Sequence, residues 1–198
     1  MDLRWLILSG VGLAIAGWST AAARRRTISA AESRVFHAVN GLPDGLYRFL
    51  WLPMQLGNLV VGTVAGLVVA LVDGDAVVAL GVVLAMVLKL VVERIVRREM
   101  ADYLSVRQRP GTSQVGAVLR GDVPSSGPSF PSGHVILVAG IGSVVTPLLP
   151  ATWWWVPAVL ALLVMFGRVY VGAHNPLDVT AGLGAGLLLG GVVAVLVD

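Results

Sequence analysis

Long apolar runs separated by short polar segments dominate this sequence. Each run is close to the length of about 20 helical residues that crosses the hydrocarbon core of a bilayer. Six runs can be drawn, at approximately residues 5–23, 53–72, 76–92, 134–149, 153–169 and 176–197. The pattern predicts an all-α, polytopic membrane protein with six transmembrane helices in one bundle, forming a single domain over residues 1–198.

Composition supports this prediction and removes several classes of function. Hydrophobic residues make up 57% of the chain and charged residues 13%, with a mean hydropathy of +0.86. These values exclude an ordinary soluble domain. The sequence has no cysteine, so disulfides, thiolate catalysis and cysteine metal sites are excluded. We expect the protein to interact with the lipid bilayer and not with nucleic acid. The sequence does not indicate whether the protein is a monomer or an oligomer.

The first run has an alternative interpretation as a cleaved signal peptide, because the small residues Thr20 to Ala23 resemble a cleavage site. The arginines at 24–26 follow at once and favour a retained span, as a stop-transfer flank does. Residues 27–52 mix apolar and charged positions. They predict short interfacial helices anchored by Tyr47 and Trp51, with His37 in a structural role.

Residues 93–133 form the longest polar stretch and are rich in Gly, Ser and Pro, which is typical of a functional loop. The loop ends in Ser129-Phe130-Pro131-Ser132-Gly133-His134, directly before an apolar run. A helix beginning here would offer free backbone N–H groups to an anion, with a histidine beside them. An ordinary helix N-cap is the alternative.

A second group of polar residues joins the last two runs. Asn175 suits an N-cap and Pro176 a first helical position, so the carboxylate of Asp178 can reach back toward His174. A carboxylate that orients an imidazole in this way prepares it for nucleophilic attack. A capped helix start and a His/Asp metal site remain alternatives, although the nearby arginines disfavour a bound cation. Arg168 suits either phosphate binding or anchoring at the membrane boundary.

If the six spans alternate in direction, the polar loop and both motifs meet on one side of the membrane. Polar groups gathered at one end of a helical bundle indicate a functional site.

These motifs resemble the three-part signature of the type 2 phosphatidic acid phosphatase superfamily, integral membrane lipid phosphatases related to vanadium haloperoxidases. The resemblance covers roughly Asn40 to the C-terminus and rests on three elements: Arg109-Pro110, Pro131 to His134, and Arg168 with His174 and Asp178. It implies hydrolysis of a lipid-linked phosphomonoester or pyrophosphate without metal or cofactor.

The resemblance also assigns roles to individual residues. His174 would be the nucleophile that forms a phosphohistidine, Asp178 would orient it, and His134 would protonate the leaving oxygen. The groups that would hold the phosphoryl oxygens are Arg109, Arg168, Ser132 and the amide of Gly133.

The first motif departs from the family pattern, because Asp102 stands where the family usually has a lysine. We expect another cation to bind phosphate in its place. The candidates are Arg98, Arg107, Arg97 and Lys89. Arg98 is the best placed if the helix continues, since its 11-residue separation from Arg109 is close to three turns.

Two hypotheses on function therefore stand: a lipid phosphatase, and a non-catalytic lipid-phosphate binder or structural membrane partner. Retention of both histidines and Asp178 favours the phosphatase.

Alternation also predicts an orientation in the cell membrane. It places the Arg24 to Arg26 cluster on the catalytic side and leaves Asp73 and Asp75 on the other. The positive-inside bias then predicts a cytoplasmic catalytic face, whereas the family commonly places that face outside the cytoplasm.

Overall fold

The computed structural model describes residues 3–25, 28–99 and 107–197, and within these ranges the protein is built from helices. Short 3-10 turns lie at Asp44–Leu46, Thr146–Leu148 and Ala151–Trp153. The α-helices are α1 (Leu3–Ala23), α2 (Ala30–Asn40), α3 (Tyr47–Gln55), α4 (Leu59–Asp73), α5 (Ala76–Glu99), α7 (Pro110–Ser113), α8 (Gly133–Val145), α9 (Trp155–Tyr170) and α10 (Pro176–Val197). The prediction of an all-α fold is confirmed.

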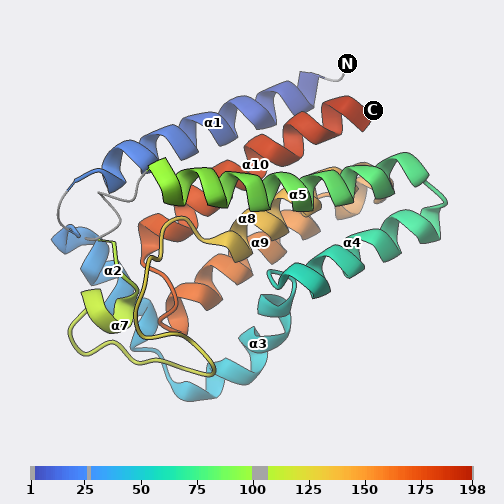
Figure 1. Cartoon of the computed structure of the whole chain (residues 1–198). Helices are drawn as coiled ribbons and strands as arrows, with labels where there is room; N and C mark the ends of the chain where they lie inside the picture. Colours follow the sequence, from blue (N-terminus) through green and yellow to red (C-terminus); the bar gives the residue numbers. More distant parts are fainter. Residues whose placement is uncertain (1–2, 26–27, 100–106, 198) are drawn as a thin grey trace.

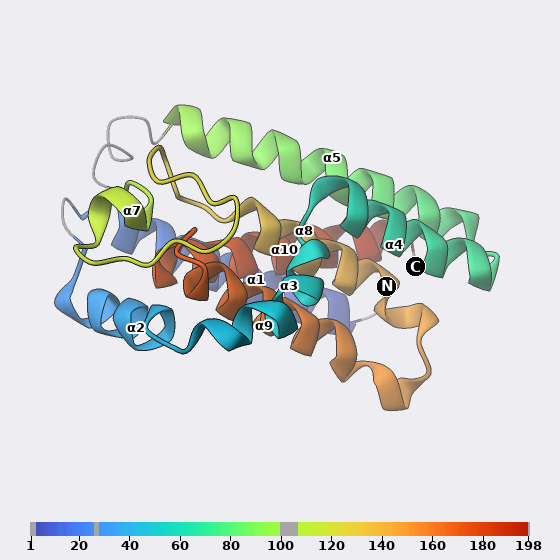
Figure 2. The same cartoon turned by 90° about the horizontal axis from the view of Figure 1, so that it is seen from below.

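Helix α8 lies in the middle of the bundle, and α4, α5, α9 and α10 pack around it (Figure 1). Helix α1 lies along α10, and both chain ends are at one end of the bundle. The loop that leads to α8, together with α2 and α7, covers the opposite end (Figure 2). The polar motifs therefore lie at the end of the bundle away from the termini.

Small residues allow the helices to approach closely. A Cβ at Gly184 of α10 would lie 2.5 Å from the backbone nitrogen of Ala16 in α1, and one at Gly186 would lie 2.7 Å from the Ala139 side chain in α8. Interfaces of this kind are typical of helices packed in lipid, where backbone contact replaces the hydrophobic driving force.

By length and composition, four helices in the described residues can cross a membrane: α1, α5, α9 with its preceding turn, and α10. The pair α3–α4, bent by 59° at a short break, makes a fifth span if counted as one. The predicted fourth span corresponds to Gly133–Leu148, which is shorter than an ordinary span and is enclosed by other helices. The protein is thus a multi-pass membrane protein, but the predicted count of six is not confirmed.

Two predicted boundaries were wrong. The second span was expected to begin near residue 53, but the helix stops at Gln55 and restarts at Leu59, because the Asn58 side chain accepts the N–H groups of Val60 and Val61 at 3.0 and 3.3 Å. The functional loop was expected from residue 93, but α5 continues to Glu99. Short helices do follow the first span, as α2 and α3.

Candidate active site

The motif residues come from four separate segments and meet at the end of the bundle opposite the chain termini. The loop before α7 supplies Arg109, and the start of α8 supplies Ser132, Gly133 and His134. The last turn of α9 supplies Arg168, and the turn into α10 supplies His174 and Asp178. The side chains of Arg168, Lys89 and Arg109 all face His134 closely enough to act on its charge.

His174 is buried, at 5% exposure, and its ring is fixed by the backbone. Its Nδ1 lies 2.8 Å from the carbonyl oxygen of Ser129. A carbonyl can only accept, so Nδ1 carries the proton and the lone pair of Nε2 is left for chemistry. Burial, followed by the charges of Arg168 and Arg109, holds the pKa of His174 well below its ordinary value. The imidazole therefore stays neutral and nucleophilic below neutral pH.

Asp178 does not form the expected hydrogen bond with His174, because its Oδ2 lies 4.0 Å from the ring Nδ1. Oδ2 instead accepts the backbone N–H of Asn175 at 2.9 Å, and Oδ1 accepts two N–H groups of Arg107 at 2.8 and 2.9 Å. The backbone carbonyl of Ser129, and not the Asp178 carboxylate, therefore orients the His174 ring. A backbone carbonyl of this kind cannot be recognised from the sequence.

Arg107, a candidate phosphate ligand from the sequence, is paired with two carboxylates in the structure. It is 2% exposed and also donates to Glu32 of α2, with its NH2 2.6 Å from Oε1. Burial alone would lower the pKa of Arg107, but the Asp178 and Glu32 carboxylates outweigh burial and raise it. A guanidinium satisfied by two carboxylates has little capacity left for a phosphate.

Glu32 was missed by the sequence analysis. Besides pairing with Arg107, it accepts the N–H of Leu177 in the first turn of α10 at 3.0 Å. The available signal was the Ser29–Glu32 pair: Ser29 accepts the Glu32 N–H at 3.1 Å as the N-cap of α2.

Arg109 and Arg168 lie close enough to both histidines for their charges to act on the two rings. Arg109 donates to the Ala173 carbonyl at 3.2 Å, and burial, followed by the charge of Arg97, lowers its pKa. Arg168 Nε and Ser132 Oγ are buried and have no hydrogen-bond partner within the described residues. Buried polar groups are normally paired, so these two atoms mark a place where a ligand's oxygens can bind.

The structure does not support Arg98 as the stand-in for the missing lysine. Helix α5 ends at Glu99, so the helical spacing assumed between Arg98 and Arg109 is interrupted. Arg98 is exposed, whereas Arg97 is the residue whose charge acts on Arg109. Asp102 lies outside the described residues.

The break between α3 and α4 touches the site, which the sequence did not predict. A Cβ at Gly57 would lie 2.6 Å from the Cβ of His134, so the chain can pass this close only with glycine there. Beside it lies a cavity of about 330 Å³, reaching His134 and Arg168. Its other lining residues are Tyr47, Trp51, Met54, Gln55, Asn58, Arg120, Asp122, Val123 and Val171.

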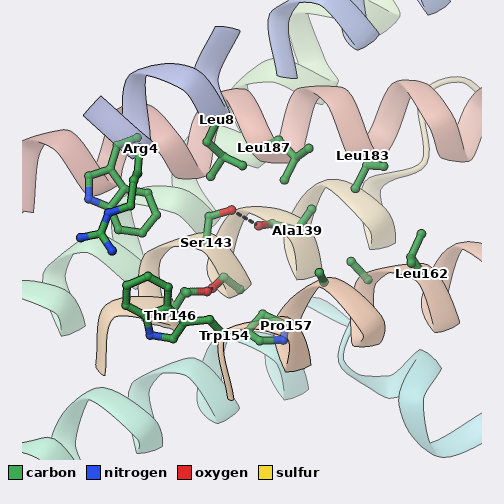
Figure 3. A pocket seen from close by; sticks show the side chains of 14 residues that line it. Arg4, Leu8, Ala139, Ser143, Thr146, Trp154, Pro157, Leu162, Leu183 and Leu187 are labelled. Atoms are coloured by element: carbon green, nitrogen blue, oxygen red, sulfur yellow. Dashed lines mark hydrogen bonds between the residues drawn. The ribbon is translucent and has the colours of Figure 1, made fainter. Parts of the chain in front are cut away.

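A second cavity, of about 450 Å³, lies toward the end of the bundle that holds the termini. Figure 3 shows Leu8, Leu183, Leu187 and Leu162 around it, with Ser143 already bonded to the Ala139 carbonyl at 2.8 Å. Arg4 lies over the Trp154 ring, 4.7 Å from its centroid. None of the motif residues lines this cavity.

The His/Asp metal site considered from the sequence finds no support in the described ranges. They contain no group of three or more His, Asp or Glu side chains that could hold a metal ion.

Comparison with known proteins gives matches over the same motifs. Residues 76–198 match the family described as the PAP2 superfamily. An undecaprenyl-diphosphatase from Sulfolobus acidocaldarius is 38% identical over 89 residues, which are 44% of this chain and 42% of that protein. The bacitracin transport permease protein BcrC from Bacillus licheniformis is 44% identical over 61 residues, 30% of this chain and 29% of its own length. The match thus spans less than half of either relative.

Two solved structures share the fold. A transmembrane PAP2-type phosphatidylglycerolphosphate phosphatase from Bacillus subtilis has a TM-score of 0.73 at 22% identity, covering 92% of this chain and 94% of that one. LpxE from Aquifex aeolicus has a TM-score of 0.64 at 21% identity, covering 81% of this chain and 92% of its own.

Proposed function

This chain belongs to the PAP2 superfamily, and on that premise we propose that it is a membrane lipid phosphatase acting through a phosphohistidine, without a metal ion. The observation that carries the proposal is the buried His174, held by Ser129 with Nε2 available, at the same end as Arg109 and Arg168. The unpaired Arg168 Nε and Ser132 Oγ add a place for phosphoryl oxygens.

The reaction proceeds in two displacements. Nε2 of His174 attacks the phosphorus, the bond to the leaving oxygen breaks, and His134 gives that oxygen its proton. Water then attacks the phosphorus, gives one proton back to His134 and breaks the phosphorus–nitrogen bond, which releases inorganic phosphate and restores both histidines. Arg109, Arg168, Ser132 and the Gly133 amide bind the phosphoryl oxygens and stabilise their charge.

Asp178 acts as a positioning residue. Its carboxylate fixes the first turn of α10 through Asn175 and binds Arg107, and it lies 4.0 Å from the His174 ring. A negative charge at that distance stabilises the positive charge that the ring gains when it is phosphorylated.

The substrate class is a lipid-linked phosphomonoester or pyrophosphate. Relatives named for undecaprenyl diphosphate and for phosphatidylglycerol phosphate support both types. The test is release of inorganic phosphate by the purified chain in detergent with EDTA, from phosphatidic acid, phosphatidylglycerol phosphate and a polyprenyl diphosphate. Inhibition by vanadate is measured separately, without EDTA. An acid-labile phosphoprotein should form and should be absent from His174→Ala. Binding of vanadate without release from any lipid would identify a lipid-phosphate binder instead.

We also propose that the protein lies in the cell membrane with its catalytic end in the cytoplasm. Helix α1, which Arg24 and Arg25 follow, ends at the same end of the bundle as α2, which carries Arg34, and Asp73 and Asp75 flank the turn between α4 and α5 at the far end. Single cysteines at Val115, which is 96% exposed, and at Asp73 test this in intact cells with an impermeant thiol reagent. Labelling at Asp73 alone supports the proposal, and labelling at Val115 alone overturns it.

A further inference from the structure

The start of α8 has a carboxylate lying against it. If Gly133 carried a Cβ, that atom would overlap Oε1 of Glu93 and would lie 3.1 Å from Cε of Lys89. Both residues come from α5, one helical turn apart, and their side chains are only 13% and 12% exposed. An acidic and a basic group therefore lie together at the place assigned to phosphoryl oxygens.

The two side chains are paired with each other. Lys89 Nζ lies 2.9 Å from Glu93 Oε2, while the exposed Arg97 lies 3.8 Å from Oε1. An anion beside a helix N-terminus is favoured by the free N–H groups and the helix dipole. The Glu93 carboxylate lies beside the first residue of α8, at the end of the helix that favours an anion.

Lys89 is the only lysine of the 198 residues, in a chain with 13 arginines. Its charge acts on His134 together with those of Arg168 and Arg109. The other candidates for the missing lysine are less suitable: Arg107 is held by two carboxylates, and Arg98 is exposed. An ammonium is a compact point charge that can exchange one anion for another without matching a planar geometry.

We propose that Lys89 is the third phosphate-binding cation of the site and that Glu93 is its exchangeable partner. Without substrate, the Glu93 carboxylate neutralises Lys89 at the start of α8. When substrate binds, its phosphoryl oxygens take this place on Lys89 and the α8 N-terminus, and Glu93 turns toward Arg97. This inference rests on the proposed function and adds a phosphate-binding residue to that site.

The two residues then have opposite effects on anion binding, which a purely structural ion pair would not produce. Lys89→Met removes the cation and leaves the Glu93 charge facing the anion, so orthovanadate binding should weaken about tenfold or more, as for loss of a charge-assisted bond. Glu93→Gln removes the competitor and should tighten vanadate binding several-fold. The double variant should lie between these two.

The measurement is the apparent Kd for orthovanadate, from its stabilisation of the full-length purified protein against thermal unfolding in detergent without a chelator. Arg94→Gln, on the exposed side of α5 next to Glu93, is the matched control and should leave the Kd unchanged. If the Lys89→Met protein does not fold, the Kd of the Glu93→Gln protein tests the proposal by itself, with tighter vanadate binding as the expected result.

Equal Kd values, or weakening by both substitutions, would overturn the inference. This readout needs no turnover, so its failure is distinct from failure of the proposed function. If the protein hydrolyses lipid phosphates and neither substitution changes the Kd for vanadate, the proposed function stands and the roles of Lys89 and Glu93 are rejected. If the Kd rises for Lys89→Met and falls for Glu93→Gln but no lipid phosphate is hydrolysed, the phosphatase activity is rejected and the roles of Lys89 and Glu93 in anion binding stand.

Discussion

The two ends of the bundle differ in what closes them. At the end with the termini, an apolar cavity of about 450 Å³ is lined by leucines, alanines and small polar groups that bond to their own helix. At the other end, Arg107, Glu32 and Asp178 bond across segments more than 70 residues apart. Apolar packing thus closes one end without specific contacts, whereas the buried charges of Arg107, Glu32 and Asp178 are each met by a partner from a distant segment.

The largest effect is expected for His174→Ala at the polar end. Removing the only proposed nucleophile should lower phosphate release by about a thousandfold or more. His37→Ala is the matched control, because His37 is exposed on α2 and should keep near-normal rates. A comparable loss of phosphate release in both variants would contradict the assignment of His174 as the nucleophile.

Arg107→Met should cost about 3–5 kcal/mol of unfolding free energy, because it leaves the Glu32 and Asp178 carboxylates buried without their cation. Thermal unfolding in detergent measures this. Arg98→Met, at an exposed position on α5, should change stability by less than about 0.5 kcal/mol. A phosphate ligand without a structural role would instead lose activity and keep its stability.

The pH profile should show a weaker but diagnostic effect. The proposed reaction needs a neutral His174, and the pKa of His174 is lowered by burial and by the charges of Arg168 and Arg109. As pH falls, kcat/KM should therefore persist below pH 6.5 and decline only at the lowered pKa. Arg168→Gln removes a repelling positive charge, so the acid limb should move up by about one pH unit. An acid limb above pH 6.5 in the unsubstituted protein would contradict the assignment.

The smallest effect is expected at the apolar end. Ala158 lines the large cavity and is exposed, so Ala158→Phe adds apolar volume where space exists. Phosphate release should stay within about twofold, since the residue is remote from the chemistry. A large loss of kcat would show that the two ends are coupled.

Much of this architecture was readable from the sequence because the bilayer imposes long apolar helices. The sixth run matches α10 residue for residue, and the motif residues gather at one end. Contacts between segments far apart in the chain could not be predicted from the sequence. Which arginine meets Asp178 depends on how the loop folds back, and Arg98 and Arg107 look alike along the chain. The Ser129 carbonyl that holds His174 has no side-chain signature at all.

The network around Arg107 also orders events during synthesis. Glu32 is made early, Arg107 midway and Asp178 only when α10 begins, yet all three must be present to neutralise one another. Until α10 enters the bundle, Arg107 lacks Asp178, and the turn carrying His174 has no first helical turn to rest on. Contacts between segments so far apart form late. Under the proposed function, a nascent chain would therefore lack an assembled site until its last helix has joined the bundle.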